Sequence, residues 1–296
     1  MTGNGEDQQP TVLAVVLTYE SRQGLAECLE ALRGQSRPLD GTLVVDNASS
    51  EPVDDLVAAM PNGRVLRLEQ NLGPAGGHAA GLAAFLTSAN SFAWVMDDDC
   101  QPRSDALAAL LAAGHGGRTL VLARAIDAEG GAHIRGIGWW GVLIPRAAVA
   151  QVGLPNADLF WWTEDNEYLG RRIPRGGFST RRCEDAIVTV ARGRSSPSKP
   201  AWKYFYEARN EVYHRLWTQQ ADGVRPVRHH LKLRVRVWRA SRATMLLAVR
   251  ALVIERDQRA RKVWLVLRGA YDGVIRRLGR TIPADEAHRP SRSRDQ

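Results

Sequence analysis

The sequence contains few cysteines, and none of them are closely paired. Cys28, Cys100 and Cys183 are the three cysteines in 296 residues, and no C-x-x-C pair occurs. A framework of disulfide bonds and a structural zinc site are therefore not indicated. Sparse, unpaired cysteine is consistent with a reducing compartment, so we expect a cytoplasmic location.

Long apolar runs are also missing. A membrane-spanning helix needs about 18 or more consecutive apolar residues, and the best candidate, Met245 to Ile254, is interrupted by Arg250. The first ten residues are polar and acidic without an apolar core, which argues against a secretory signal peptide. We expect residues 1–10 and 283–296 to be disordered, because neither segment has apolar residues to bury.

Acidic residues are scarce in the last third of the chain. Residues 201–296 hold 22 Lys and Arg against 9 Asp and Glu, a net charge of +13, so residues 1–200 carry −5 of the total +8. Such a basic region can bind nucleic acid, an anionic membrane surface or an acidic partner, and its charge alone does not choose among them.

From Thr11 onward, buried strand patterns alternate with amphipathic helix patterns. We expect strands at residues 12–17, 42–45, 64–68 and 92–97, and helices at residues 24–34 and 77–88. This alternation predicts an α/β domain whose mostly parallel sheet is flanked by helices on both faces. Ligands of such sheets bind beyond the carboxyl ends of the strands.

A glycine-rich turn at residues 71–78 runs into a predicted helix. Glycines allow close approach of the backbone to a ligand, and a helix N-terminus offers free N–H groups to phosphate. The turn does not match a dinucleotide-binding fingerprint, because the first strand lacks G-x-G-x-x-G. A simple packing turn remains an alternative. We expect His78 to be a helix-start residue rather than a metal ligand.

Three consecutive aspartates, Asp97, Asp98 and Asp99, end the predicted strand at residues 92–97. Adjacent carboxylates repel one another unless a cation shares them, so a divalent metal carrying a phosphate is one interpretation. The alternative is a solvated acidic turn in which Asp105 caps the next helix.

Aromatic and acidic residues cluster between residues 139 and 168. The four tryptophans of this region are either ordinary core residues or a stacking surface for a sugar. Glu164, Asp165 and Glu167 lie at a predicted helix start, where they would either cap the helix or take part in chemistry.

Taken in order, these motifs resemble the inverting family 2 glycosyltransferases with the GT-A fold. The resemblance covers about residues 11–217 and is strongest to bacterial galactofuranosyltransferases of cell-wall galactan synthesis. It is carried by the following motifs: Thr18; Asp46-Asn47-Ala48-Ser49; Asn71-Leu72-Gly73 with Gly76-Gly77; Asp97-Asp98-Asp99; Trp139-Trp140 with Ile144-Pro145; Thr163-Glu164-Asp165-Asn166-Glu167-Tyr168; and Tyr206 with Arg209-Asn210. Residues 218–282 would form a basic, mainly helical C-terminal region.

The resemblance implies a role for each matching position. The metal, Mn²⁺ or Mg²⁺, would be held on the donor diphosphate by Asp97 and Asp99. Asp165 would be the catalytic base that deprotonates the acceptor hydroxyl, with Glu164 as the alternative. The remaining implied contacts are Thr18, Asp46, Asn71, Gly73 and Asp98 for the donor, and Trp139 and Trp140 for the acceptor.

One position departs from the family pattern. Relatives supply a third metal ligand, often His, where this chain has Thr189. We expect the metal to be held by two aspartates, the diphosphate and water, as Mg²⁺ commonly allows. The alternatives are a ligand from the loop at residues 193–198, or a weakened site. Arg192 and Arg194 would assist the diphosphate or remain solvated.

The basic C-terminal region allows two secondary structures. Residues 231–239 alternate apolar and basic residues like a strand, yet they run into a helical pattern at residues 240–252. Basic helices with Trp and Leu suit an anionic membrane surface, so we expect peripheral attachment at the inner face of the cell membrane and no nucleic acid partner. A basic face packed against the catalytic domain or a partner subunit is the alternative.

Three functions are therefore considered. The first is a metal-dependent inverting glycosyltransferase with a glycan or polyprenyl-linked acceptor, for which UDP-galactofuranose is the favoured donor and dTDP-rhamnose the next. The second is a sugar-phosphate nucleotidyltransferase, which would need a Gly-rich basic loop after the first strand that Thr18 to Arg22 does not supply. The third is a catalytically silent nucleotide-sugar-binding or membrane scaffold protein.

Overall fold

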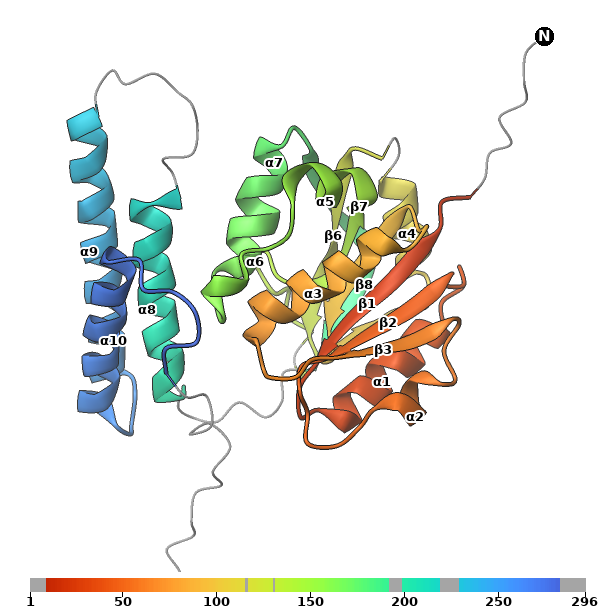
Figure 1. Cartoon of the computed structure of the whole chain (residues 1–296), viewed down its shortest axis with the longest axis horizontal. Helices are drawn as coiled ribbons and strands as arrows, with labels where there is room; N and C mark the ends of the chain where they lie inside the picture. Colours follow the sequence, from red (N-terminus) through yellow and green to blue (C-terminus); the bar gives the residue numbers. More distant parts are fainter. Residues whose placement is uncertain (1–8, 115–116, 130, 192–198, 219–228, 283–296) are drawn as a thin grey trace, which may run out of the picture. The chain divides into compact units, whose positions relative to one another are not determined.

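The computed structural model describes residues 9–114, 117–129, 131–191, 199–218 and 229–282 (Figure 1). The chain forms two compact units. The sheet unit comprises Met1–Asn156 and Asp165–Gly193, and the helical unit comprises Ala157–Glu164 and Arg194–Gln296. Several segments considered above lie outside the described residues, namely residues 1–8 and 283–296, Arg192, Arg194 and the loop at 193–198.

The sheet unit is built on an eight-stranded sheet in the order β3-β2-β1-β4-β7-β6-β8-β5. Its strands are β1 (Val12–Thr18), β2 (Gly41–Asp46), β3 (Gly63–Arg67), β4 (Phe92–Asp97), β5 (Cys100–Pro102), β6 (Thr119–Asp127), β7 (Trp140–Pro145) and β8 (Ser179–Val190). The four strands expected from the sequence are confirmed. They form the half in which β3, β2, β1 and β4 are parallel.

The second half of the sheet is mixed. β7 is antiparallel to both β4 and β6, β8 is parallel to β6, and β5 is antiparallel to β8. The expected α/β sheet with helices on both faces is confirmed. Its antiparallel pairings all lie in the half of the sheet between β4 and β5. Because β7 returns alongside β4, the residues just before β7 reach the edge at which β4 ends.

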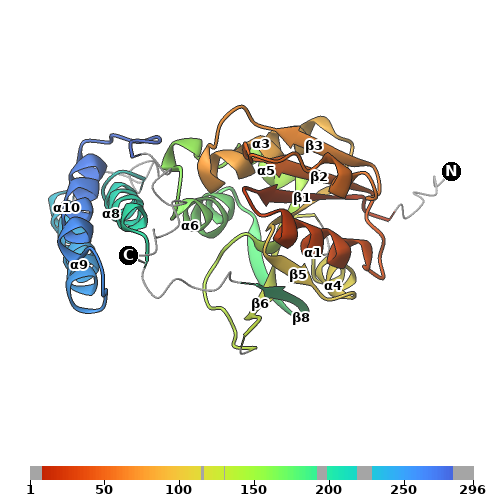
Figure 2. The ribbon, with the colours of Figure 1, turned by 90° about the horizontal axis from the view of Figure 1, so that it is seen from below.

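Helices cover both faces of the sheet (Figure 2). Alternate residues of β1 point to opposite faces: Val12 and Val16 pack against α1 (Arg22–Arg33) and α4 (Ala106–Ala113), and Leu13 and Val15 against α3 (Gly73–Thr87) and α5 (Arg146–Val152). The other short elements of this unit are α2 (Asp54–Val57), α6 (Glu164–Glu167), a π-helical turn at Tyr168–Arg172 and α7 (Ile173–Arg175). A strand buried on both faces needs the continuous apolar run that β1 has.

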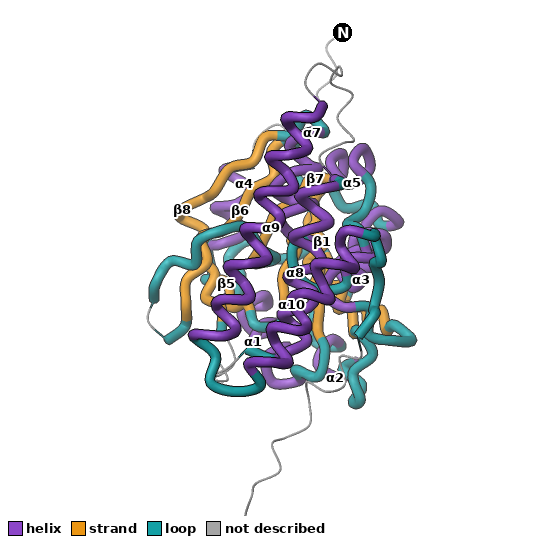
Figure 3. Tube along the Cα trace, turned by 90° about the vertical axis from the view of Figure 1, so that its left-hand side faces the viewer, coloured by secondary structure: helices purple, strands orange, loops and turns teal. Residues whose placement is uncertain are grey.

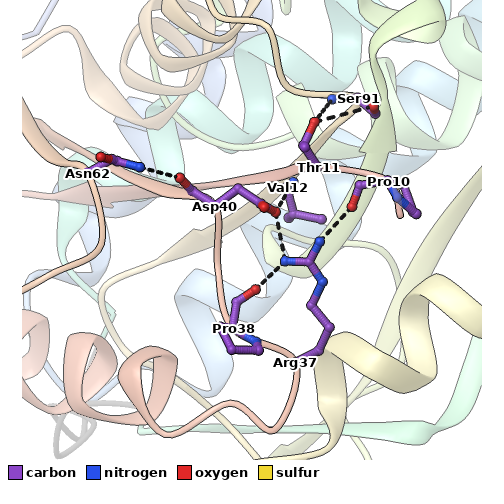
Figure 4. A network of polar contacts seen from close by, with 8 residues as sticks. All are labelled: Pro10, Thr11, Val12, Arg37, Pro38, Asp40, Asn62 and Ser91. Atoms are coloured by element: carbon purple, nitrogen blue, oxygen red, sulfur yellow. Dashed lines mark hydrogen bonds and ion pairs between the residues drawn. The ribbon is translucent and has the colours of Figure 1, made fainter. Parts of the chain in front are cut away.

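A polar network holds the amino-terminal edge of the sheet (Figure 4). Asp40 accepts hydrogen bonds from the backbone N–H of Val12 at 2.8 Å and from Arg37 at 2.7 Å, and Arg37 also donates to the Pro10 carbonyl at 2.7 Å. The side chain of Asn62 donates to the Asp40 carbonyl at 2.8 Å. These contacts fix the start of β1, and with it the position of its other end.

The helical unit consists mainly of α8 (Ala201–Leu216), α9 (His229–Val253) and α10 (Arg259–Val274), which lie side by side (Figure 3). The described part of residues 231–239 belongs to α9, so the helical interpretation of this segment is correct. By its contacts α8 belongs with α9 and α10, whereas the sequence analysis extended the family resemblance through residue 217. That boundary remains a prediction. No helix among the described residues is both long and apolar enough to cross a membrane.

Two glycines allow α10 to lie close against α8. A Cβ atom on Gly269 would overlap the carbonyl oxygen of Phe205, and one on Gly273 would overlap the carbonyl oxygen of Arg209. Both obstacles are backbone atoms of α8, so a side chain at either position would push the helices apart. The close approach therefore depends on the absence of side chains at these two positions.

We predict that Gly269→Ala destabilises the protein. Alanine normally stabilises a helix by about 1 kcal/mol relative to glycine, but overpacking costs about 1–3 kcal/mol, so the net change should be a loss. Gly34→Ala is the control, because its Cβ would meet its nearest neighbour at 3.6 Å. Thermal unfolding of both variants tests this, and a Gly269→Ala protein as stable as wild type would contradict it.

Candidate active site

The three aspartates after β4 are held by backbone hydrogen bonds to three different segments. The Asp97 N–H donates to the Trp139 carbonyl at 3.0 Å, and the Asp98 N–H donates to the Leu17 carbonyl at 3.1 Å. The Asp99 carbonyl accepts from the Ala191 N–H at 2.7 Å. The turn is therefore fixed by the residue before β7, by β1 and by the end of β8. It is not a loose solvated loop.

Thr18 and Asp98 meet at the ends of neighbouring strands. The Thr18 hydroxyl donates to Oδ2 of Asp98 at 2.6 Å, and Thr18 is buried. Burial raises the pKa of Asp98 to about 7, and the Thr18 hydrogen bond opposes the shift. The two residues expected to contact the donor are thus brought into direct contact with each other.

Asn47 organises the glycine-rich turn before α3. Its side-chain amide donates to Oδ1 of Asn71 and to the Gly73 carbonyl, both at 3.2 Å, and its Oδ1 accepts from the Leu72 N–H at 2.9 Å. Gly73 has a φ of +69°, a left-handed conformation that suits glycine. The expected site residues Asn71 and Gly73 are therefore held at the end of β2 by Asn47.

Asp46 is fully buried and its carboxylate has internal partners. Oδ1 accepts from the Ser49 N–H at 2.9 Å, and Oδ2 pairs with Arg67 at 2.7 Å. Arg67 also donates to the Ser49 carbonyl. Asp46 thus fixes the loop after β2. If Asp46 also contacted a nucleotide base, it would do so while keeping its bonds to Ser49 and Arg67.

His78 lies against the strand-end aspartates, whereas the sequence analysis predicted only a helix-start residue. It lies in the first turns of α3, where Nε2 is 2.9 Å from Oδ1 of Asp97 and the ring stacks on Trp139 with 4.2 Å between centroids. Burial lowers the His78 pKa to about 3, so the imidazole is neutral. The sequence offered one cue, namely that this helix follows a glycine-rich turn at the edge where the strands end.

The two tryptophans expected on the acceptor side lie in different surroundings. Trp139 is 3% exposed and lies between His78 and Tyr168, whose ring centroid is 6.2 Å away. Trp140 begins β7 and is half-buried against the core. Trp139 therefore supports His78 from within the protein, and little of its ring is available to a sugar.

Asp165 lies in α6 and its carboxylate is tuned by its surroundings. Burial raises its pKa to about 6, hydrogen bonds from Asn166 oppose the shift, and the charge of Asp97 adds to it. Oδ1 accepts from the Asn166 N–H at 2.6 Å and from its side-chain amide at 2.8 Å. Glu164, the alternative base, is only 5% exposed. The carboxylate of Asp165 is thus more basic than that of an ordinary aspartate.

The aspartates partly fit a divalent cation. Burial raises the Asp97 pKa to about 7, as it does for Asp98, and a bound cation would offset this cost of burying charge. Within the described residues, however, no group of three or more His, Cys, Asp or Glu side chains is assembled to hold a metal. Thr189 pairs with Gln101 of β5, and Ala191, two residues later, donates its N–H to the Asp99 carbonyl. Thr189, which stands where relatives often have His, therefore lies near the aspartates.

Residues 13–148 of the chain are similar to a known protein family. Residues 13–148 match the model of glycosyl transferase family 2. The chain is 38% identical over 106 residues to galactofuranosyltransferase GlfT1 of Mycolicibacterium smegmatis, covering 35% of each chain. It is 39% identical over 92 residues to GlfT1 of Mycobacterium tuberculosis, covering 30% of each chain. The match thus spans about a third of these relatives.

The fold matches solved glycosyltransferase structures. The mannosyltransferase PcManGT of Pyrobaculum calidifontis, in complex with GDP-Man and Mn²⁺, superposes with a TM-score of 0.56 at 16% identity, covering 90% of this chain and 87% of that one. This likeness concerns the fold alone. Together with the mixed sheet, it confirms the GT-A architecture expected from the sequence.

We predict that the partly buried aspartates Asp97 and Asp98 make the metal-free protein less stable as pH rises. An unfolded aspartate loses its proton near pH 4, whereas Asp97 and Asp98 keep theirs to about pH 7. The free energy of unfolding should therefore fall between about pH 4 and 7 and level off above that. Asp98→Asn should reduce the fall by on the order of 1 kcal/mol.

Urea unfolding in EDTA across this pH range measures the effect. Glu69→Gln, which removes an exposed carboxylate, serves as the control and should keep the wild-type slope. An Asp98→Asn protein with an unchanged slope would show that Asp98 does not carry the buried charge.

Proposed function

We propose that this protein is an inverting glycosyltransferase, because residues 13–148 match the model of glycosyl transferase family 2. It would move a sugar from a nucleotide-sugar donor to a glycan or polyprenyl-linked acceptor during the synthesis of a cell-envelope polysaccharide. The observation that carries the proposal is the hydrogen-bonded edge of the sheet, where Thr18 bonds Asp98 and His78 bonds Asp97.

In the proposed reaction, Asp165 acts as the general base. Its carboxylate takes the proton of the acceptor hydroxyl while that oxygen bonds to the anomeric carbon of the donor. The bond from the anomeric carbon to the phosphate oxygen breaks, and the electron pair leaves with the nucleoside diphosphate. Attack from the opposite face inverts the configuration. A base with a pKa of about 6 is ionised at neutral pH yet more basic than an ordinary aspartate.

On the donor side, the strand ends bind and orient the nucleotide sugar. Asp97 and Asp99 would hold Mn²⁺ or Mg²⁺, which when bound neutralises charge on the departing diphosphate. Asp98, fixed by Thr18, would lie nearer the sugar, and the turn held by Asn47 would present its N–H groups to the phosphates. His78 would keep the carboxylate of Asp97 in one orientation.

The donor sugar is proposed from the relatives. Two of them bear the name galactofuranosyltransferase, which supports UDP-galactofuranose as the first donor to test and dTDP-rhamnose as the second. A catalytically silent nucleotide-sugar-binding protein is the second candidate, and it is favoured by Thr189 and by the absence of a three-ligand group among the described residues. Turnover separates the two functions.

We predict that Asp165 and Asp99 have separable roles. Nucleotide sugars are first screened, with Mn²⁺ or Mg²⁺, for those that raise the melting temperature, because a ligand of the folded state stabilises it. With the best donor, Asp165→Asn should lower transfer by at least about 100-fold, as expected for loss of a general base, and should leave donor binding nearly unchanged. Asp99→Ala should instead weaken metal-dependent donor binding.

The control is Glu129→Gln, an exposed carboxylate of the same unit, which should behave as wild type. If Asp165→Asn loses binding and transfer equally, Asp165 is not the base. If donor binds but no diphosphate is released with either metal, the silent alternative is correct.

The helical unit supports a second part of the proposal, attachment to an anionic membrane surface. Of the 17 large apolar side chains that are exposed among the described residues, 15 lie between residues 233 and 275, mostly on α9 and α10. On α9, Leu246, Val249 and Val253 are spaced as one helical face. A contiguous apolar surface of this kind marks an interaction site.

Charge favours a bilayer as the partner. Trp238 lies 5.9 Å from the Arg242 guanidinium and Trp264 lies 5.3 Å from that of Arg268, a pairing of aromatic and basic side chains that suits the lipid headgroup region. An open apolar groove of about 640 Å³ lies among α8, α9 and α10, and it would admit lipid chains. The net charge of +13 in residues 201–296 selects anionic lipids.

We predict that the full-length protein floats with phosphatidylglycerol-containing vesicles at low salt and much less with pure phosphatidylcholine vesicles. Val249→Asp combined with Leu252→Asp should lower the bound fraction severalfold, because both side chains are at least half exposed and would carry charge into the bilayer. Thr87→Asp, on an exposed position of α3, is the control. A wild-type protein that stays wholly unbound at low salt would refute membrane attachment.

A further inference from the structure

The groove among α8, α9 and α10 is an apolar surface within the helical unit, with a volume of about 640 Å³. None of the described residues that line it is charged. Val212 of α8 and Ala240 of α9 line it and are buried, so they form its floor. Met245 of α9 and Leu267 of α10 also line it, and both side chains are more than half exposed, as 59% and 57%. Large apolar side chains thus stand at its rim.

Small side chains keep the groove open. Ala240 and Ala270 line it, and a larger side chain at either position would fill part of the space. Its hydroxyl groups do not require a ligand. The hydroxyl of Thr244 donates to the Ala240 carbonyl at 3.0 Å, and the residues Ser241 and Tyr271 are exposed to solvent. A hydrocarbon, which has no hydrogen bonds to offer, can therefore occupy the groove.

The size of the groove favours one hydrocarbon chain over a helix. A water molecule takes up about 30 Å³ of liquid and a CH₂ group is of similar size, so the groove holds on the order of 20 such groups. A helix about 10 Å wide fills about 420 Å³ in each turn of about 5.4 Å, so the groove would hold less than two turns. The lining residues of α9, from Val237 to Ala248, extend over about 17 Å, which suits an extended chain.

Arginines lie at one end of the groove. Arg276 follows the lining residue Val274 by two positions, and its guanidinium lies 3.8 Å from the centre of the Trp217 ring. Trp217 packs against the floor of the groove and donates from Nε1 to the Gly273 carbonyl at 3.1 Å. Arg276 and its neighbour Arg277 are exposed, and neither forms an ion pair with a carboxylate in the described part of the chain. An anion can therefore reach cations at this end.

We propose that the groove binds one lipid molecule, a single-chain lipid phosphate, with its hydrocarbon chain among the three helices and its phosphate on Arg276 beside Trp217. A guanidinium binds phosphate through two parallel hydrogen bonds, and burial of the chain removes apolar surface from water. The inference rests on the proposed membrane attachment for the source of the lipid, which is the bilayer. It adds a site that holds one lipid as a ligand.

The test measures binding to the full-length protein by isothermal titration calorimetry. The probe is lauroyl lysophosphatidic acid below its micelle concentration. Lauroyl lysophosphatidylcholine has the same chain on a head group without net charge, and inorganic phosphate represents the head group alone. The acid should bind with one molecule per protein and roughly tenfold more tightly than the choline form, as expected for one hydrogen-bonded pair with a charged group. It should also raise the melting temperature, since a ligand of the folded state stabilises it. Inorganic phosphate should not bind detectably.

The head-group contact is tested with Arg276→Gln. This variant should bind the acid roughly tenfold more weakly and should bind the choline form within about twofold of wild type. Arg256→Gln is the matched control, because it removes one charge from another exposed arginine of the same unit. It should bind the acid within about twofold of wild type, because salt screens a charge that does not touch the ligand.

The place of the chain is tested with Ala270→Phe, whose ring would fill the groove. It should weaken binding of both lysolipids by at least about tenfold, because the ring and the chain need the same space. Ala260→Phe, at an exposed position of α10 outside the groove, is the control. Met245→Glu places a charge at the rim and should weaken binding as well. Its side chain is 59% exposed, so this result does not depend on repacking of the core.

Several results would overturn the inference. Equal binding of the two lysolipids, or equal losses in Arg276→Gln and Arg256→Gln, would show that Arg276 does not hold the phosphate. Wild-type binding by Ala270→Phe would show that the chain lies elsewhere. A dimer in sedimentation velocity that Ala270→Phe dissociates would show that a second copy of the chain covers the groove instead.

Vesicle flotation separates this site from the proposed membrane attachment. Ala270→Phe should float as wild type does, because it leaves the exposed face with Leu246 and Val249 intact. A wild-type protein that floats without binding the lysolipid keeps the attachment and loses the site. One that binds the lysolipid but stays off the vesicles keeps the site and loses the attachment. Release of diphosphate from the donor reports the proposed transferase activity independently of both.

Discussion

The structure depends on keeping three adjacent, partly buried carboxylates together at the end of β4. Left to themselves, Asp97, Asp98 and Asp99 would separate and turn toward water. Backbone hydrogen bonds to the segment before β7, to β1 and to the end of β8 prevent this, and the raised pKa values of the first two aspartates reflect the cost. Asp97 and Asp98 therefore keep their protons to a higher pH than ordinary aspartates do.

The surrounding elements can be understood from this constraint. The β1 end supplies Thr18, which hydrogen-bonds Asp98, and α3 brings His78 to Asp97. Trp139 then fills the space against His78, and Tyr168 follows behind it. The polar edge of the sheet is thus backed by aromatic side chains, which exclude water and strengthen the electrostatic interactions among the carboxylates.

The loop before Asp165 shows the same principle in the helical unit. Left-handed backbone at bulky residues such as Phe160 and Trp162 is unfavourable, and here Asn210 and Arg209 of α8 offset the cost through buried hydrogen bonds to the loop carbonyl groups. Both regions combine a locally unfavourable conformation with surrounding contacts that fix it. Such combinations occur where geometry matters more than local stability.

Much of the fold and the site could be read from residue order, because periodicity and strand ends are local properties. The run from Val12 to Thr18 reads as a buried strand, and the glycines after Asn71 read as a turn into a helix. The antiparallel return of β7 left no such trace, since pairing between β4 and β7 joins residues about fifty positions apart. The strand-like alternation at residues 231–239 was ambiguous because arginines suit a helix surface equally well.

The sequence by itself determined the alternating α/β architecture, the aspartate triplet at a strand end and Asp165 as the candidate base, because each follows from local pattern and from a family resemblance in residue order. Only the tertiary structure decided that His78 joins Asp97, that Trp139 is buried while Trp162 is exposed, and that Asn210 holds the loop before Asp165. Burial and hydrogen-bond partners arise from segments far apart in the chain, and neither the type of a residue nor its neighbours in sequence specifies them.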